Sequence, residues 1–300
     1  MRATRVMRSA VLALVLATAA FVVPDSAVKS TEMSLVKLRG AAAVDADDPV
    51  VWILAVGSDA RPGQNMLRVR ADALQLVGIN TRTGAASAIG FPRDSWVPIP
   101  GHGYNRINAA LTFGGPELQG RTVGNFVGIQ PDYVFVTRFP FFEDMVSAIG
   151  GIEVNNPRPF SDPYLRPKGF KGGRIHLNGY DAMAFSRIRK NLAGGDFDRS
   201  ANQQRVLRGI HAKIRANADR PGFMERGVLS VMSHLHTNVR PTELFELAQL
   251  VSQVEPGKIR TCVIGGSIGN VGGASIVRPN VAQARRLGND ARRDATLRSC

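Results

Sequence analysis

Carboxylates and an arginine recur near the ends of strand-like segments early in the sequence, as Asp59, Asp72, Arg93 and Asp94. Two carboxylates beside arginines suit a hard divalent cation bound to a phosphate. Mg²⁺ takes oxygen ligands, and proteins often hold it with one or two carboxylates together with substrate phosphates and water. Taken singly, either of the first two aspartates could equally cap a turn. Their function therefore depends on whether the fold brings them together.

The apolar runs that flank these residues predict a common location for them. Runs at 50–56, 73–79 and 85–91 are typical of strands. If the first two strands are antiparallel, the loop 58–71 joins neighbouring strand ends, and turn residues at 80–84 return the third strand to the same edge. The four side chains would then meet at one edge of a sheet. A crossover between parallel strands would separate them.

A second basic cluster lies further along the chain. Arg187 and Arg189 are two residues apart, so they point the same way in an extended segment. A glycine-rich loop then leads to Asp198, the predicted N-cap of a helix that carries Arg199 and Gln203 one turn apart. A helix N-terminus beside arginines is a ready anion site. The alternative is a solvated basic face, the usual role of such a run.

Length and composition allow one large domain with a full core, since the chain has 300 residues and 44% of them are hydrophobic. The net charge of +14 favours polyanionic partners such as phosphate esters, nucleic acid or an anionic membrane surface, without choosing among them. A GC-rich genome is the alternative source of part of this arginine excess.

The N-terminus predicts export. Arg2, Arg5 and Arg8 precede an uncharged run at 9–23, which suits a signal peptide and is short for a membrane-spanning helix of about 20 residues. The positive flank predicts that the remainder lies outside the cytoplasm. A cleaved signal and a retained anchor over residues 1–27 both stay open. The expected location is the outer face of the cytoplasmic membrane or the space beyond it, and no nucleic-acid partner is expected.

The two cysteines, Cys262 and Cys300, fit an oxidising compartment. A disulfide between them would pin the C-terminus to the body of the fold, and two unrelated thiols are the alternative. There is no CxxC motif, and the histidines lack metal-ligand spacing, so structural zinc is not expected.

The rest of the sequence alternates strand-like and helical segments, which predicts an α/β domain over residues 49–300 after a linker at 28–48. Two further strands are expected at 133–137 and 259–264. Helices are expected at 116–127, 142–149, 179–187, 199–217, 224–235, 241–254 and 279–298.

Read in order, these segments resemble the LytR-CpsA-Psr family of cell-wall enzymes over roughly residues 50–210. The resemblance is carried by motifs at 53–61, 70–72, 91–97, 106–110, 114–117, 148–154, 177–179, 185–189 and 195–204. Because so many motifs occur in order, a chance match is far less probable than for any one of them.

The resemblance implies an α/β fold with a mixed central sheet, helices on both sides and an apolar tunnel for a lipid tail. It also implies a phosphotransferase assisted by Mg²⁺ (or Mn²⁺), which moves a phosphate-linked glycan from a polyprenyl pyrophosphate carrier to peptidoglycan. A pyrophosphatase acting on the same carrier and a non-catalytic binder of anionic wall polymers are the rival functions. The acidic pair argues against the binder, since carboxylates weaken anion binding unless a cation lies between them.

Carried over residue by residue, the resemblance implies that Asp59 and Asp72 hold the metal ion. Asp94 would orient Arg93, and either Asp72 or Asp196 would accept the proton of the acceptor hydroxyl. The expected phosphate-binding residues are Arg61, Arg70, Arg93, Arg187, Arg189, Arg199 and Gln203.

The sequence departs from the family pattern in three places. Asn202 stands where an arginine is usual, which removes one phosphate contact that Arg68 could replace. Ala73 and Ser147 replace a frequent threonine and aspartate. The residues that could line a lipid tunnel, with ordinary core packing as the alternative, are Phe113, Phe126, Phe135, Phe139, Phe141 and Phe142.

Overall fold

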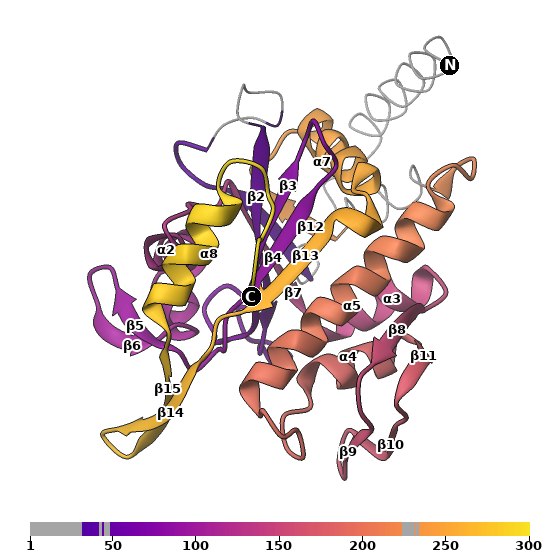
Figure 1. Ribbon diagram of the computed structural model, residues 1–300. Coiled ribbons are helices and arrows are strands. Elements are labelled where there is room, and N and C mark those ends of the chain that lie inside the picture. Colours follow the sequence, from indigo (N-terminus) through magenta and orange to yellow (C-terminus); the bar gives the residue numbers. More distant parts are fainter. Residues whose placement is uncertain (1–31, 42–43, 45–48, 224–230, 232–233) are drawn as a thin grey trace.

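The computed structural model describes residues 32–41, 44, 49–223, 231 and 234–300 (Figure 1). The predicted signal segment 1–27 and most of the helix predicted at 224–235 lie outside the described residues. Among the residues that are described, no helix combines the length and apolar character needed to cross a membrane.

A seven-stranded mixed sheet forms the centre of the molecule, with strand order β12-β1-β7-β2-β3-β4-β13. Its strands are β1 (Met33–Lys37), β2 (Val50–Ser58), β3 (Ala71–Asn80), β4 (Ala86–Gly90), β7 (Tyr133–Arg138), β12 (Leu235–Thr237) and β13 (Ile259–Val263). Strand β3 is antiparallel to both β2 and β4, as predicted. The pairs β2–β7 and β4–β13 are parallel, so the sheet is mixed.

Helices cover both faces of this sheet (Figure 1). They are α2 (Ala109–Val127), α3 (Phe139–Ala148), α4 (Gly179–Arg187), α5 (Asp196–Asn217), α7 (Pro241–Gln253) and α8 (Val281–Ala291), with a 3₁₀ turn η1 at Pro256–Lys258. Helices α2 and α8 lie together on one face, and α5 and α7 lie on the other. The predicted fold class is confirmed in this α-β-α arrangement.

The residues of β2 explain why the sheet needs cover on both sides. Trp52 and Leu54 pack with Phe126 of α2 and Leu287 of α8, whereas Val51 packs with residues of α7. Successive side chains of a strand point to opposite faces, so a strand with an uninterrupted apolar run must be covered on both faces of the sheet.

Four two-stranded antiparallel sheets extend from the central sheet and helices, and three of them are hairpins of consecutive strands. They are formed by β5 (Trp96–Ile99) with β6 (Gly103–Arg106), β8 (Ile152–Asn156) with β11 (Gly173–Leu177), β9 (Phe160–Asp162) with β10 (Arg166–Phe170), and β14 (Gly266–Val271) with β15 (Ala274–Pro279). Phe160, Phe170 and Phe185 form a separate small core between two of these small sheets and α4.

Several predicted boundaries differ from the structure. Residues 28–48 were expected to be a linker, but Met33–Lys37 forms β1, because this short apolar run pairs with both β7 and β12. The last predicted helix ends at Ala291 instead of 298, since Ala295 and Leu297 turn back into the core. The hairpins were not predicted, because runs this short and polar carry little strand periodicity.

The tunnel-lining set of phenylalanines does not form one surface. Phe126 belongs to the core beneath α2 and α8, while Phe135 packs on the opposite face of the sheet. Phe142 joins the small core beside α4, and Phe113 is 39% exposed and stacks on His102. Residues from opposite faces of one sheet cannot line a single channel, so ordinary packing accounts for most of the set.

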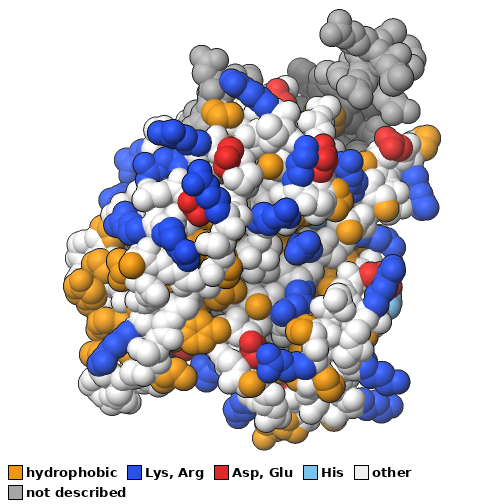
Figure 2. Space-filling model, in the orientation of Figure 1, with side chains coloured by type: hydrophobic (Ala, Val, Ile, Leu, Met, Phe, Trp, Pro, Cys, Tyr) orange, Lys and Arg blue, Asp and Glu red, His pale blue; other side chains and the backbone are white. Residues whose placement is uncertain are grey.

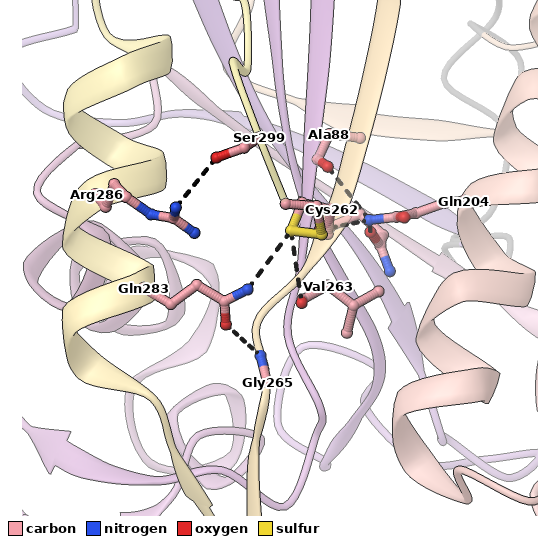
Figure 3. Close-up of a disulfide and its surroundings, with 10 residues drawn as sticks. Ala88, Gln204, Cys262, Val263, Gly265, Gln283, Arg286 and Ser299 are labelled. Atoms are coloured by element: carbon pink, nitrogen blue, oxygen red, sulfur yellow. Dashed lines mark hydrogen bonds between the residues drawn. A yellow bond between two sulfur atoms is a disulfide. The ribbon is translucent and has the colours of Figure 1, made fainter.

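A disulfide joins Cys262 to Cys300, with the two Cα atoms 5.3 Å apart (Figure 3). Of the two alternatives that the sequence left open, the structure has the bridge. Gln283 of α8 donates to Cys262 Sγ at 3.8 Å and accepts from the Gly265 N–H at 2.7 Å. The last residues of the chain are thereby fixed against β13 and α8.

Candidate active site

The ends of β2, β3 and β4 place the first group of predicted residues together. Asp59 follows the end of β2, Asp72 lies near the start of β3, and the chain leaving β4 carries Arg93. The antiparallel register pairs Ser58 with Ala71, so the strand ends that carry Asp59 and Asp72 are adjacent. Strand parity therefore predicted this edge correctly.

Arg187, the last residue of α4, connects the two aspartates. Its Nη2 lies 3.5 Å from Asp59 Oδ1, and its Nε lies 3.8 Å from Asp72 Oδ2. Asp72 is also hydrogen-bonded to Arg93 Nη1. Asp72 is only 8% exposed, and a buried charge requires a compensating partner. The two arginines supply this compensation.

Asp94 lies among three guanidinium groups, two of which are additional to those that contact Asp72. Its Oδ2 is 3.3 Å from Arg189 Nη1, and its Oδ1 is 3.7 Å from Arg106 Nε and 4.0 Å from Arg93 Nε. A carboxylate with this many arginine neighbours holds them in position relative to one another. Its contacts fit the predicted orienting role better than that of a base.

These side chains border a cavity of about 270 Å³ at the edge of the sheet. Its lining residues are Asp59, Arg70, Arg93, Asp94, Arg106, Asn108, Arg189 and Ser275. Arg106 also donates to the carbonyl of Ser275 at 2.6 Å, so the hairpin β14–β15 forms part of the wall. The volume and the basic lining suit a phosphate-bearing group.

Local structure explains how α4 delivers its arginine. The Asn178 side chain caps the helix by accepting from the Asp181 N–H at 2.8 Å. Gly179 follows, where an added Cβ would be only 1.9 Å from the carbonyl oxygen of Glu143, so α3 and α4 approach closely. The helix ends at Arg187, and Ile188 is extended, which directs Arg187 and Arg189 into the site as predicted.

Helix α5 supplies a second, deeper pair. It begins at Asp196 and not at residue 199, and Asp198 is not its N-cap, because the Asp198 carboxylate instead accepts from the Gly194 N–H at 2.8 Å. Asp196 pairs with Arg199, and both side chains are buried. Neither residue of this buried pair lines the cavity.

The arginines of the site carry excess positive charge. Burial is the main cause that lowers the pKa of Arg93, and nearby Arg199 lowers it further. Burial likewise lowers the pKa of Arg187, where Asp59 opposes the shift and Arg61 adds to it. Guanidinium groups stay protonated at any physiological pH, so crowding makes the site attractive to a multiply charged anion. Figure 2 shows that basic side chains also predominate over acidic ones on the molecule's face in that view.

Two predicted phosphate contacts lie elsewhere. The Gln203 side chain is buried, and its amide nitrogen donates to the carbonyl oxygens of Asp72 and Ser186 at 3.4 and 3.2 Å, so its amide hydrogens are engaged within the protein. Arg68 donates from Nη1 to the carbonyl oxygen of Phe113 and does not line the cavity. The sequence could not indicate these contacts, because the hydrogen-bond acceptors are backbone carbonyl oxygens.

The remaining predicted arginines reach the site to different degrees. Arg70 is exposed and lines the cavity, and Arg61 is exposed on the loop beyond it. Sequence reasoning missed Arg106, Asn108 and Ser275 as wall residues. The first two lie in the motif at 106–110, which could have indicated them, whereas the late hairpin that carries Ser275 gave no local signal.

Comparison with known proteins agrees with this geometry. Residues 19–293 match the model of the LytR_cpsA_psr family. The polyisoprenyl-teichoic acid--peptidoglycan teichoic acid transferase TagU of Bacillus anthracis is 32% identical over 199 residues, which are 66% of this chain and 63% of that protein. The chain therefore matches somewhat less than two thirds of the length of this curated relative.

Solved structures of the same family share the fold. TagV of B. subtilis aligns with a TM-score of 0.68 and 29% identity, covering 81% of this chain and 97% of that chain. TagT bound to LIIa-WTA aligns with a TM-score of 0.67 and 25% identity, covering 84% and 95% respectively. The chain belongs to the LytR-CpsA-Psr family.

Proposed function

We propose that the protein transfers a phosphate-linked glycan from a polyprenyl pyrophosphate carrier to a hydroxyl group of peptidoglycan. The observation that carries the proposal is the cavity at the sheet edge, which Asp59, Arg93 and Arg189 line, with Arg187 joining Asp59 to the buried Asp72. The name of the B. anthracis relative, a transferase from polyisoprenyl-teichoic acid to peptidoglycan, supports the same donor and acceptor classes.

In the proposed reaction, the acceptor hydroxyl oxygen attacks the phosphorus that bears the glycan. A new P–O bond forms to the acceptor, and the bond between that phosphorus and the bridging pyrophosphate oxygen breaks. Polyprenyl phosphate leaves with the bonding electron pair. Negative charge grows on the phosphate oxygens and on the leaving group, and Arg93, Arg187 and Arg189 are placed to stabilise it.

The two candidate bases differ in their surroundings. Asp72 contacts both Arg93 and Arg187. Asp196 pairs with Arg199 and also interacts electrostatically with Arg93, and its Oδ2 has no hydrogen-bond partner in the part of the chain that is described. Both carboxylates are buried, so we propose that one of these two, Asp72 or Asp196, accepts the proton of the acceptor hydroxyl.

The acidic pair fits a divalent cation. Asp59 and Asp72 lie close enough to share Arg187, and they would hold Mg²⁺ or Mn²⁺ together with phosphate oxygens and water. The described residues contain no group of three or more potential ligands among His, Cys, Asp and Glu, so substrate oxygens must complete the shell. Such an ion would neutralise charge on the pyrophosphate.

The donor sets the expected location. A polyprenyl carrier resides in a membrane, so we place the protein at the outer face of the cytoplasmic membrane or in the adjoining wall. The lipid tail of the carrier would lie in an apolar channel of the fold. The predicted export segment supports this placement.

The test is product analysis with a lipid-linked phosphoglycan donor and peptidoglycan oligomers. Transfer predicts a phosphodiester-linked product and polyprenyl phosphate, dependent on Mg²⁺ and abolished by EDTA. Asp59→Ala and Arg93→Ala should each lower turnover by about a hundredfold or more, while the exposed Arg174→Ala serves as the matched control.

The alternatives give different products. Free phosphoglycan with polyprenyl phosphate would identify a pyrophosphatase, in which water replaces the acceptor. Donor binding without turnover would identify a non-catalytic binder and refute the proposal, as would wild-type turnover in both variants.

A further inference from the structure

Three buried glutamine side chains, Gln75, Gln203 and Gln204, form a hydrogen-bonded chain next to the site. We call this chain the amide network. The three side chains belong to residues with 2%, 7% and 4% exposure. Gln75 comes from the middle of β3, and the other two come from α5. Three amides buried in an otherwise apolar sheet-helix contact are costly unless they satisfy one another.

Gln75 is the centre of the amide network. Its Nε2 donates to Gln203 Oε1 at 3.2 Å and lies 3.0 Å from Ser200 Oγ. Its Oε1 accepts from Gln204 Nε2 at 3.1 Å. The residue therefore donates in one direction and accepts from the other, which joins the two α5 glutamines into one continuous chain.

Each end of the amide network holds backbone of a different element. Gln203 donates to the carbonyls of Asp72 and Ser186, the latter immediately preceding Arg187. Gln204 donates to the carbonyls of Ala88 on β4 and Cys262 on β13, at 3.2 and 2.9 Å. Figure 3 shows Gln204 extending towards Ala88 and Cys262, next to the disulfide.

The network is also tightly enclosed. At Gly90, the last residue of β4, an added Cβ would be 2.6 Å from Ser200 Oγ and 2.9 Å from both Gln75 Oε1 and Gln204 Nε2. Any side chain at this position would have to displace the side chains of the amide network or of Ser200. Such close packing leaves the amides little freedom to rearrange.

We infer that Gln75 is a positioning residue for the reaction: through Gln203 it fixes Asp72 relative to Arg187. The inference rests on the proposed function for its catalytic consequence. In this structure the amide nitrogen of Gln203 donates to the carbonyl oxygens of Asp72 and Ser186.

The amide network controls the position of Asp72 relative to Arg187 in the site. Asp72 reaches the site from β3, and Arg187 reaches it from the end of α4, elements that are far apart in sequence. Gln203 bonds to the backbone at Asp72 and at the residue before Arg187, so it sets the separation of the carboxylate and the guanidinium. A displacement of about 1 Å in such a pair can cost about a hundredfold in rate.

The first test uses Gln75→Met, which keeps length and apolar bulk but removes both hydrogen-bonding functions. Hydrogen–deuterium exchange of the intact protein should accelerate in peptides covering 71–76 and 184–190 and remain unchanged in α8. Gln283→Met, which loses hydrogen bonds to Gly265 and Cys262, is the matched control and should leave both peptides unchanged. Unaltered exchange, or equal acceleration throughout the molecule, would overturn the inference.

The second test is kinetic. Gln75→Met should lower kcat by about tenfold to a hundredfold with little change in KM for the lipid-linked donor. Combined with Gln203→Met, the loss should be smaller than the product of the two single losses, because both variants break one chain. Multiplicative losses would show independent roles and refute the network. Because the exchange experiment needs no substrate, absence of transferase activity in the wild type would refute the proposed function alone.

Discussion

The Arg187 guanidinium lies over the ring of Phe139, with its Cζ atom 4.1 Å from the ring centroid. The ring covers one face of a cation whose nitrogens point towards Asp59 and Asp72. An arginine confined in this way has lost much of its rotamer freedom before substrate arrives, so less entropy is lost on phosphate binding.

Phe139→Leu should therefore weaken catalysis without touching any polar group. A cation–π contact of about 0.5–2 kcal/mol corresponds to a fall in kcat/KM of between about twofold and thirtyfold. The measurement is steady-state turnover of the lipid-linked donor. Phe142→Leu, in the same helix but packed in the small core beside α4, is the control. Equal losses in both variants would assign the effect to packing of α3.

The Asp94→Asn variant should distinguish the orientation of the arginine side chains from their attraction for the donor. Losing the charge that lies between Arg93, Arg106 and Arg189 releases these side chains but makes the cavity more positive. We expect kcat to fall by about tenfold or more while KM for the donor does not rise. Asp162→Asn, at an aspartate that accepts from turn amides, is the control. A raised KM with unchanged kcat would contradict the orienting role.

Opening the Cys262–Cys300 bridge should destabilise the fold. The bridge closes a loop with a sequence separation of 38, for which chain entropy gives about 4 kcal/mol. Denaturant unfolding of the Cys262→Ser/Cys300→Ser double variant measures the difference. The same loss should follow when the wild type is reduced, whereas the reductant should not affect the double variant.

Stability should also depend on pH through His211. Burial lowers the pKa of this histidine below its ordinary value of 6.5, and nearby Arg215 adds to the effect. The folded state therefore resists protonation that the unfolded chain accepts, so this contribution is complete above pH 6.5 and is lost as the pH falls below that value.

His211→Gln should flatten this dependence, whatever its effect on absolute stability. The measurement is the difference between the free energies of unfolding at pH 7.5 and pH 5.5. His236→Gln, at an exposed histidine, should keep the wild-type difference. A His211→Gln protein with the full wild-type difference would show that other groups govern the acid sensitivity.

The sequence was sufficient for the strands and helices with strong periodicity. The three strands around Asp59, Asp72 and Arg93 and their antiparallel order followed from apolar runs and one turn, and these placed half of the site. Arg187 and Arg189 joined that half as their spacing indicated. Local patterns sufficed here because each side chain lies at or near the end of its element.

The long-range contacts could not be predicted in this way. The roles of Gln75 and Gln203 depend on the docking of α5 against β3. The contact between Gln75 and Ser200, for example, joins residues that are 125 positions apart in the chain. The wall at Ser275 depends on a hairpin that returns from the far end of the sequence. No spacing rule reaches across such distances, so the tertiary structure was needed.

Both outer strands of the central sheet come late in the sequence, since β12 pairs with β1 and β13 pairs with β4. A nascent chain that ends before residue 235 thus exposes the unpaired backbone of β1 on one side and of β4 on the other. Open strands of this kind readily recruit other chains. Synthesis or truncation that stops short of β13 should therefore yield aggregation-prone fragments, which depend on chaperones until the last quarter of the polypeptide emerges.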